Sequence, residues 1–182
     1  MTIDDCINVQ ASEFSGYLNN ESLRNVFYGT VHGEDIWMNN GIEKEVWVPM
    51  FVKQFCTMQV PYTYLNRYKR LGYTGNSEDG YAVTFSEGVE TCGSSLSITK
   101  NGIELKKGYD VILPLTDDNR IFIAYSENGK EGKWNVPDAD FEKAKVYNIT
   151  ADGNEYISDV TVENKEITLA LKAGQAVAVI AQ

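Results

Sequence analysis

The sequence predicts a mainly β protein, an antiparallel β-sandwich preceded by a short helical segment. Apolar residues at helical spacing are confined to the first part of the chain, and after residue 80 they give way to short β-rich runs of alternating polarity. Pairs of turn-forming residues separate these runs. The densest turn-forming cluster, Gly72–Gly80, marks the change. We therefore expect a helical lead-in over residues 1–75 and a β-sandwich over residues 76–182.

Two segments of the lead-in have the spacing of amphipathic helices. Asn20–Phe27 begins with a capping asparagine that precedes apolar residues three and four apart. A stronger apolar stripe follows, and we interpret it as core rather than as a binding groove. Pro61 is expected to end this second helix, and Tyr62–Arg70 to form a shorter third one. The stripe consists of Trp47, Met50, Phe51, Gln54, Phe55 and Met58.

Nine runs behind the glycine-rich cluster are predicted to be strands. Between them, Asn101–Gly102, Asn128–Gly129, Asp152–Gly153 and Ala173–Gly174 supply residues that accept positive φ. We also expect one helical turn over Pro137–Lys143. The predicted strands are Tyr81–Phe85, Leu96–Thr99, Tyr109–Leu113, Arg120–Tyr125, Lys133–Val136, Ala144–Ile149, Tyr156–Val162, Glu166–Leu171 and Gln175–Ile180.

The composition is that of a folded, acidic protein. The 182 residues include 16 lysines and arginines against 26 aspartates and glutamates, which gives a formal net charge of −10, and 43% of the residues are hydrophobic. A surface of this sign repels phosphate backbones and anionic lipids, so we expect neither nucleic acid nor a membrane as a partner. No apolar run approaches the roughly 20 residues of a membrane-spanning helix. We expect no signal peptide in this chain, because its first residues lack a basic and an apolar region.

The residues of common catalytic sites do not occur in the required patterns. The single histidine, His32, excludes zinc motifs built on two histidines, and we interpret it as structural or exposed. Glycine-rich nucleotide loops and the GxSxG motif are absent. No two carboxylates stand out as the acid and base of a glycosidase, and Asp117, Asp118, Asp138 and Asp140 suit turns or caps. No catalytic residue is therefore assigned.

No metal or other cofactor is expected. Calcium stays as an alternative, because Asp152–Glu155 and Asp117–Asn119 each offer oxygen ligands, although neither matches the DxDxDG loop. The three cysteines, Cys6, Cys56 and Cys92, are an odd number at wide spacing. We interpret them as free thiols, two of them buried, with a single disulfide as the alternative.

Aromatic side chains are the remaining candidates for a binding role. The chain has 11 tyrosines, 3 tryptophans and 7 phenylalanines, and flat rings stack on sugars. Trp134 and Tyr125 flank the Ser126–Gly132 loop, and Tyr156 begins a later strand. We name Trp134, Tyr125 and Tyr156 as candidate carbohydrate-binding residues. The structural interpretation is that Trp134 closes the edge of the core and that Tyr125 packs beside it.

From Pro61 onward, several segments follow one another in an order that resembles a known family. They are Val60–Leu65, Val83–Val89, Ile98–Gly102, Asp110–Pro114, Ile121–Tyr125, Gly129, Lys133–Pro137 and Val146–Gly153. Together they are similar to the end of a bacterial endo-α-N-acetylgalactosaminidase, a glycoside hydrolase that removes the disaccharide core from mucin-type O-glycans. Within this resemblance, Val60–Leu65 is similar to the family's Pro-x-x-(Tyr/Phe)-Leu helix behind its catalytic barrel.

The resemblance implies a non-catalytic part of a larger enzyme. On this reading the lead-in packs against a catalytic barrel, the partner is a glycan or glycoprotein, and the parent protein is secreted or on the cell surface. The family's hairpin histidine has no counterpart in Ile123–Tyr125, and Leu115 stands where an aromatic residue often follows Pro114. The implied catalytic Asp and Glu match no position in this chain. The alternatives are a free-standing carbohydrate-binding module and, third, a protein–protein module.

Overall fold

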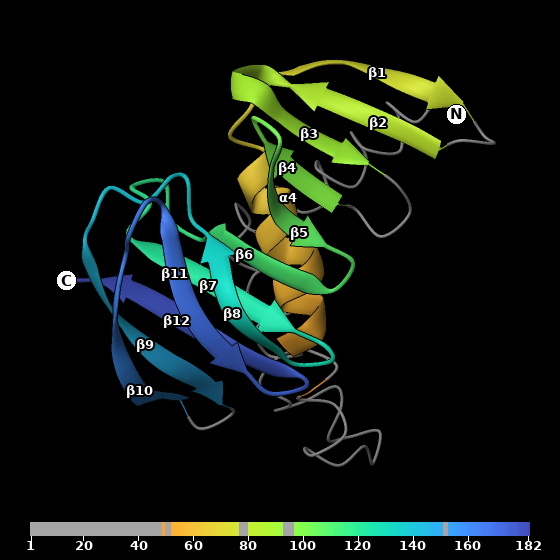
Figure 1. The fold of residues 1–182 in the computed structure, drawn as a ribbon. Coiled ribbons are helices and arrows are strands. Elements are labelled where there is room, and N and C mark those ends of the chain that lie inside the picture. Colours follow the sequence, from red (N-terminus) through yellow and green to blue (C-terminus); the bar gives the residue numbers. More distant parts are fainter. Residues whose placement is uncertain (1–48, 50–51, 77–79, 93–96, 151–152) are drawn as a thin grey trace, which may run out of the picture.

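The computed structural model describes residues 49, 52–76, 80–92, 97–150 and 153–182, and it is mainly β, as the sequence predicts. Its strands pair in antiparallel fashion into a ten-stranded sheet and a two-stranded sheet (Figure 1). The order in the larger sheet is β1-β2-β3-β4-β5-β6-β7-β12-β9-β10. These strands are β1 (Arg70–Asn76), β2 (Gly80–Phe85), β3 (Val89–Cys92), β4 (Ser97–Lys100), β5 (Ile103–Lys107), β6 (Asp110–Pro114), β7 (Ile121–Ser126), β9 (Lys143–Thr150), β10 (Gly153–Thr161) and β12 (Gln175–Ala181).

The smaller sheet consists of β8 (Lys130–Asn135) and β11 (Glu166–Leu171), which lie over one face of the larger sheet (Figure 1). A helix lies against the other face. It is α-helical over residues 52–54, forms a π-helical turn over Phe55–Gln59, and continues as α4 over Val60–Leu65. The described chain thus forms three layers, with a helix, a long sheet and a short sheet.

Two apolar cores lie between these layers. Cys56, Val60 and Tyr64 of the helix belong to the first core, together with residues of the larger sheet. Trp134 of β8 and Leu169 of β11 belong to the second core, against the opposite face of that sheet. We call these the helix core and the sandwich core.

The central strands contribute side chains to both cores in alternation. In β12, Ala176 and Ala178 belong to the helix core, whereas Val177 and Val179 belong to the sandwich core. Successive side chains of a strand point to opposite faces, so a strand covered on both faces reads as a continuous apolar run. This double burial explains why Gln175–Ala181 lacks the alternation that marks Glu166–Leu171.

The prediction that Pro61 ends the helix is wrong, because the helix continues to Leu65. Proline lacks the backbone N–H and its ring clashes with the carbonyl of the fourth residue before it. The π-helical turn directly before Pro61 widens the backbone there: the N–H of Val60 bonds to the carbonyl of Phe55, five residues earlier. This wider turn accommodates the ring, and Tyr62–Arg70 consequently forms no separate helix.

The face that the helix packs against the sheet matches the predicted stripe only in part, since Phe55 packs against the helix core but Gln54 and Met58 do not belong to it. Gln54 is exposed, Phe55 is half-buried and Met58 is 41% exposed, whereas Cys56, Val60 and Tyr64 are buried against the sheet. These three residues are four apart and therefore lie on one face. Trp47, Met50 and Phe51, like Asn20–Phe27, His32 and Cys6, lie outside the described residues.

Three strands were not predicted: β1, β3 and β5. The first contains two glycines, the second is four residues long, and the third is rich in charged residues, so none carries a strong strand pattern. The expected helical turn at Pro137–Lys143 is instead a reverse turn, in which the N–H of Ala139 bonds to the carbonyl of Val136 at 3.0 Å. The expected turn glycines Gly102, Gly129, Gly153 and Gly174 all have positive φ.

The proposed division of the chain at residues 75 and 76 stays a prediction, since residues 1–48 and 50–51 are outside the described part. The larger sheet begins earlier than expected, at Arg70 in β1. Among the described residues, Cys56 is a buried free thiol and Cys92 an exposed one. No helix within these residues is long and apolar enough to cross a bilayer.

A buried lysine should make stability depend on pH. Lys106 is 2% exposed, its Nζ donates to the carbonyl of Gly108 at 2.5 Å, and burial lowers its pKa from 10.5 to about 8. Between these two pH values the unfolded chain binds more protons at this position, so stability rises with pH. We expect the free energy of unfolding of wild type, measured relative to Lys106→Met, to increase by about 1 kcal/mol per pH unit from pH 8 to 10.

Urea denaturation of both proteins at each pH measures this difference. Groups that titrate in both proteins contribute equally to the two free energies, so their contributions cancel. A difference that stays constant across the interval would show that Lys106 titrates normally in the folded state. Lys107→Met, in an exposed neighbour on the same strand, is the matched control and should leave the pH dependence unchanged.

Candidate functional site

Two of the three candidate carbohydrate-binding rings are interior residues. Trp134 and Tyr125 are each 3% exposed, and they belong to different cores: Trp134 to the sandwich core and Tyr125 to the helix core. The larger sheet lies between these cores, so the structure does not bring the two rings together. The expectation that Trp134 packs in the core is confirmed, whereas Tyr125 does not pack beside it. Sugar binding by these residues stays a prediction.

Trp134 is held by its neighbours rather than presented to solvent. Ile167 of β11 is its cross-strand partner, and the Nζ of Lys130 lies 4.3 Å from the centre of its ring. The buried indole Nε1 has no hydrogen-bond partner among the described residues. Burial and then the charge of Glu127 raise the pKa of Tyr125 to about 12, so this phenol stays protonated at neutral pH.

Tyr156 is the candidate ring that solvent reaches, with 57% of its surface exposed. It lies on β10 directly opposite Tyr147 of β9, and the two rings meet edge to face with centroids 5.9 Å apart. Its hydroxyl donates to Oδ1 of Asp159 at 3.2 Å. Burial and this carboxylate raise the pKa of Tyr156. The exposed ring of Tyr156 is thus held beside the carboxylate of Asp159, whose second oxygen takes no part in this hydrogen bond.

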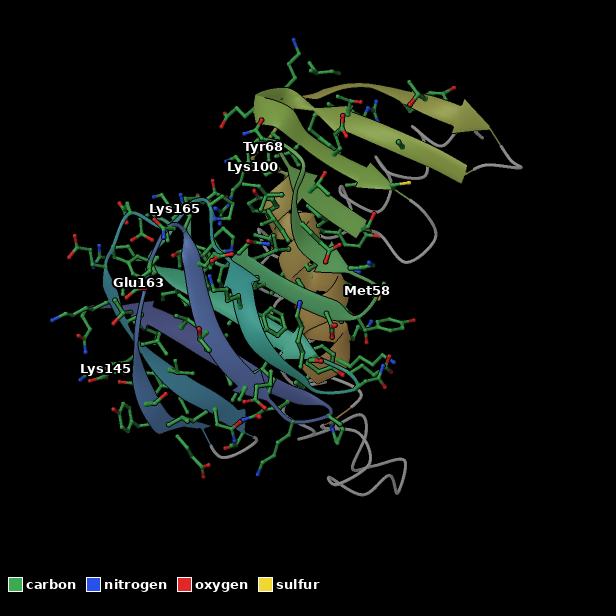
Figure 2. The ribbon with its side chains drawn as sticks, in the orientation of Figure 1. Met58, Tyr68, Lys100, Lys145, Glu163 and Lys165 are labelled. Carbon is green, nitrogen blue, oxygen red and sulfur yellow. The ribbon has the colours of Figure 1, made fainter. Side chains whose placement is uncertain are left out.

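A polar cluster lies at the end of α4 and joins the helix to the sandwich. Oδ2 of Asp138 accepts a hydrogen bond from the hydroxyl of Tyr64 at 3.0 Å, and its Oδ1 accepts one from Nζ of Lys100. The same Nζ donates to the hydroxyl of Tyr68 at 3.2 Å (Figure 2). We call Tyr64, Tyr68, Lys100 and Asp138 the clamp cluster. It connects the helix and the segment behind it to β4 and to the turn after β8.

The contacts within the clamp cluster favour a charged Lys100 and a protonated Tyr64. Burial lowers the pKa of Lys100, but the hydrogen bonds to Asp138 and Tyr68 outweigh it, so the pKa is raised overall. Burial, Tyr68 and Asp138 raise the pKa of Tyr64. The side chains of Lys100 and Asp138 are only 14% and 10% exposed. A carboxylate enclosed by an ammonium and a phenol suits a structural link better than proton transfer to a substrate.

Of the carboxylates that the sequence assigns to turns or caps, Asp118 has such a role, whereas Asp138 is the nearly buried acceptor of the clamp cluster. Oδ1 of Asp118 accepts from Thr116 Oγ1 at 2.6 Å and from the N–H of Arg120 at 3.1 Å, and these bonds lower its pKa. Asp117 is exposed and pairs with Arg67 at 3.3 Å. Among the described residues, no three His, Cys, Asp or Glu side chains gather in a way that could hold a metal ion.

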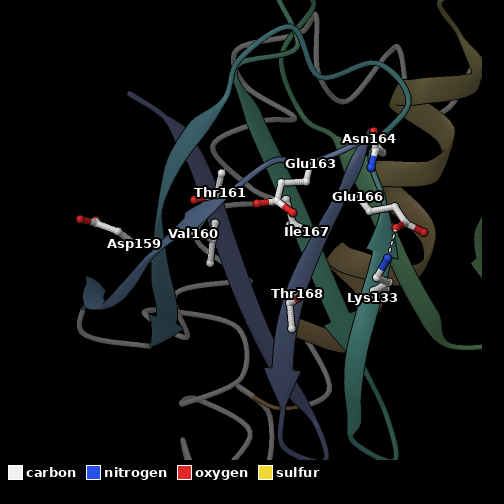
Figure 3. Close-up of a pocket in the computed structure, with 9 residues that line it drawn as sticks. All are labelled: Lys133, Asp159, Val160, Thr161, Glu163, Asn164, Glu166, Ile167 and Thr168. Carbon is white, nitrogen blue, oxygen red and sulfur yellow. Dashed lines mark hydrogen bonds and ion pairs between the residues drawn. The ribbon is translucent and has the colours of Figure 1, made fainter.

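A groove of about 380 Å³ lies where β10 and β11 diverge, and the sequence gives no sign of it (Figure 3). Nζ of Lys133 is 2.6 Å from Oε2 of Glu166 at its rim, and this contact raises the pKa of Lys133. Asn164 and Lys165 connect the strands with φ of 54° and 62°, a left-handed turn that contains no glycine. The groove is lined by Lys133, Asp159, Val160, Thr161, Glu163, Asn164, Glu166, Ile167 and Thr168.

Among the comparisons with known proteins, the one with solved structures finds similar chains. No family model matches the sequence, and no curated protein matches it. A GH30 endoxylanase from Clostridium papyrosolvens C71 has 13% identity and a TM-score of 0.30, over 69% of this chain and 28% of that chain.

A glycoside hydrolase family 30 subfamily 8 xylanase from Clostridium acetobutylicum has 11% identity and a TM-score of 0.29, over 69% of this chain and 28% of that chain. CelM2, a bifunctional glucanase-xylanase from a metagenome library, has 14% identity and a TM-score of 0.30, over 56% of this chain and 18% of that chain. The chain therefore spans less than a third of the length of each of these structures.

Proposed function

We propose that this chain is a non-catalytic β-domain of a secreted glycoside hydrolase, and that its helical lead-in attaches the domain to a catalytic barrel. The single observation that carries the proposal is that the helix and the larger sheet share one apolar core. In the sequence, the helix and the strands behind it are also the parts that resemble the end of an endo-α-N-acetylgalactosaminidase.

The contacts between the helix and the β-domain hold the helix in a fixed orientation. Val60 and Tyr64 of the helix are buried against the sheet, and the clamp cluster ties the same helix to the sandwich through Asp138. Interfaces within a chain that are both apolar and hydrogen-bonded hold their partners in a fixed orientation. A polypeptide that precedes the helix would therefore be held rigidly relative to the β-domain, as a structural support for a barrel requires.

Activity on mucin-type O-glycans is the finer part of the proposal, and its support is the sequence resemblance. The solved structures that the chain is similar to are a GH30 endoxylanase, a family 30 xylanase and a glucanase-xylanase. The chemistry would reside in an Asp and a Glu on the barrel, since no carboxylate pair in this sequence stands out for that role.

Two measurements test the proposal. The coding DNA upstream of Met1 is expected to encode a barrel, and the purified chain is expected to release no disaccharide from a core-1 O-glycopeptide. Release of disaccharide by the chain itself would overturn the non-catalytic assignment. A gene without a barrel would overturn the attachment to one.

A second candidate function, a carbohydrate-binding module, is favoured by the exposed Tyr156 ring and the Asp159 carboxylate beside it. A sugar ring would stack on the tyrosine while its hydroxyls donate to the carboxylate. If the module binds core-1 disaccharide, Tyr156→Ala is expected to weaken binding by about fivefold, as loss of about 1 kcal/mol of ring contact predicts.

Titration calorimetry measures this binding. Tyr73→Ala removes another exposed tyrosine, on β1, and serves as the matched control that should bind like wild type. Equal affinities of wild type and Tyr156→Ala would remove Tyr156 from the site. Trp134→Ala is unsuitable for this test, because Trp134 is buried and its loss changes stability.

A further inference from the structure

We propose that the groove between β10 and β11 binds an extended peptide strand with alternating apolar and basic side chains, through unpaired backbone groups of both strands. This inference does not rest on the proposed glycoside hydrolase function. It follows from the hydrogen-bond register at the turn that joins the two strands.

The hydrogen-bond register at the turn defines which backbone groups face the groove. Glu163 and Glu166 exchange both backbone hydrogen bonds at 2.9 Å, across the turn formed by Asn164 and Lys165. In an antiparallel hairpin the next pair outward is not hydrogen-bonded, and the pair after it is. That next hydrogen-bonding pair would be Thr161 and Thr168. Yet no pairing between β10 and β11 beyond Glu163 and Glu166 occurs in the described residues.

The neighbouring strands confirm the direction of these groups. The N–H of Val162 bonds to the carbonyl of Glu142, on the β9 side, so the backbone groups of Thr161 point the other way, into the groove. The N–H of Glu166 points to Glu163, so by the same alternation Thr168 also faces the groove. Asp159 and Ala170, two residues further along, repeat these orientations. The groove thus lies between two facing rows of backbone donors and acceptors.

Beyond the turn, β10 and β11 do not pair with each other. β10 belongs to the larger sheet and β11 to the smaller one, so the two strands diverge after the turn (Figure 3). A β-bulge between Tyr156 and Ser158 then interrupts the regular part of β10. Bulges protect edge strands from unspecific pairing. The edge that stays available on β10 is therefore the short stretch from Ser158 to Thr161, at the groove.

The side chains that line the groove are apolar at its floor and mostly acidic around it. Val160 and Ile167 give the groove an apolar floor, whereas Asp159, Glu163 and Glu166 place carboxylates around it. Lys133 is the basic residue among the lining residues, and it already pairs with Glu166. An added strand points alternate side chains inward and outward. Its inward residues should be apolar and its outward residues basic, because the carboxylates outnumber the lysine.

The test uses a fluorescent peptide of alternating valine and lysine and the whole 182-residue chain. We expect saturable binding by fluorescence anisotropy, together with slower amide hydrogen exchange of Thr161 and Thr168. Thr168→Pro removes a groove-facing N–H that β8 does not use, and it should weaken binding at least tenfold. Thr168→Val keeps the N–H and removes the hydroxyl, so it is the matched control and should bind like wild type.

Charge is tested separately. Glu163→Gln should weaken peptide binding about threefold and reduce its salt dependence. A peptide with proline in place of the central valine keeps its charge but cannot pair as a strand, and it should not bind. Equal binding of this proline peptide, or of Thr168→Pro with its fold verified by circular dichroism, would overturn the strand geometry. A dimer in light scattering that Thr168→Pro dissociates would assign the groove to a second copy and overturn the proposal as well.

Discussion

Trp134→Ala is expected to lower the free energy of unfolding by about 3–5 kcal/mol. The indole is almost fully buried in the sandwich core, where it is paired across the strands with Ile167. Removal of the ring leaves a cavity between two sheets whose backbone hydrogen bonds prevent them from collapsing into it. Urea denaturation followed by far-ultraviolet circular dichroism measures the change.

Trp134→Phe serves as the control, because it keeps an aromatic ring and should recover part of the loss. Phenylalanine also removes the indole Nε1, which has no partner among the described residues. If Trp134→Ala unfolded at the same urea concentration as wild type, the ring would not be the centre of the sandwich core. An exposed role of Trp134 in sugar binding would then regain support.

Asp138→Ala is expected to cost about 3 kcal/mol, because it leaves the nearly buried Lys100 ammonium without a carboxylate partner and the Tyr64 hydroxyl without its acceptor. The loss should appear in thermal and urea unfolding alike. Asp138→Asn keeps an oxygen acceptor but no charge, and an intermediate loss is expected. Asp140→Ala removes an exposed neighbouring carboxylate and is the matched control, with little expected change.

A double variant separates the ion pair from the packing around it. Asp138→Ala combined with Lys100→Met removes both charges, and we expect its loss to be smaller than the sum of the two single losses. Strictly additive losses would show that Asp138 and Lys100 do not interact in the folded protein.

Alternation of polarity predicted the strands that have one buried face. Glu166–Leu171 is the clearest case, because Ile167, Leu169 and Leu171 are buried while Thr168 and Ala170 are exposed, and the predicted and observed bounds are the same. Turn chemistry was equally informative at Asn101 and Gly102, whose φ values of 50° and 77° match the hairpin that the pair predicts.

Features set by long-range packing could not be predicted in this way. The π-helical turn before Pro61 has no distinctive sequence pattern, and without it the proline indicates a helix end. The burial of Tyr125 depends on a helix that lies far away in sequence. The groove depends on β10 and β11 joining different sheets, and the turn that connects them lacks the glycine by which sequence patterns reveal such turns.

Native-state hydrogen exchange tests most directly whether the helix and the sheet form one structural unit. Because they share a core, we predict that the slowest amides of Val60–Leu65 exchange with the same free energy, and the same urea dependence, as those of β7 and β12. Helix amides that open at a clearly lower free energy, while the strands stay protected, would contradict a rigid attachment of the sandwich to whatever precedes the helix.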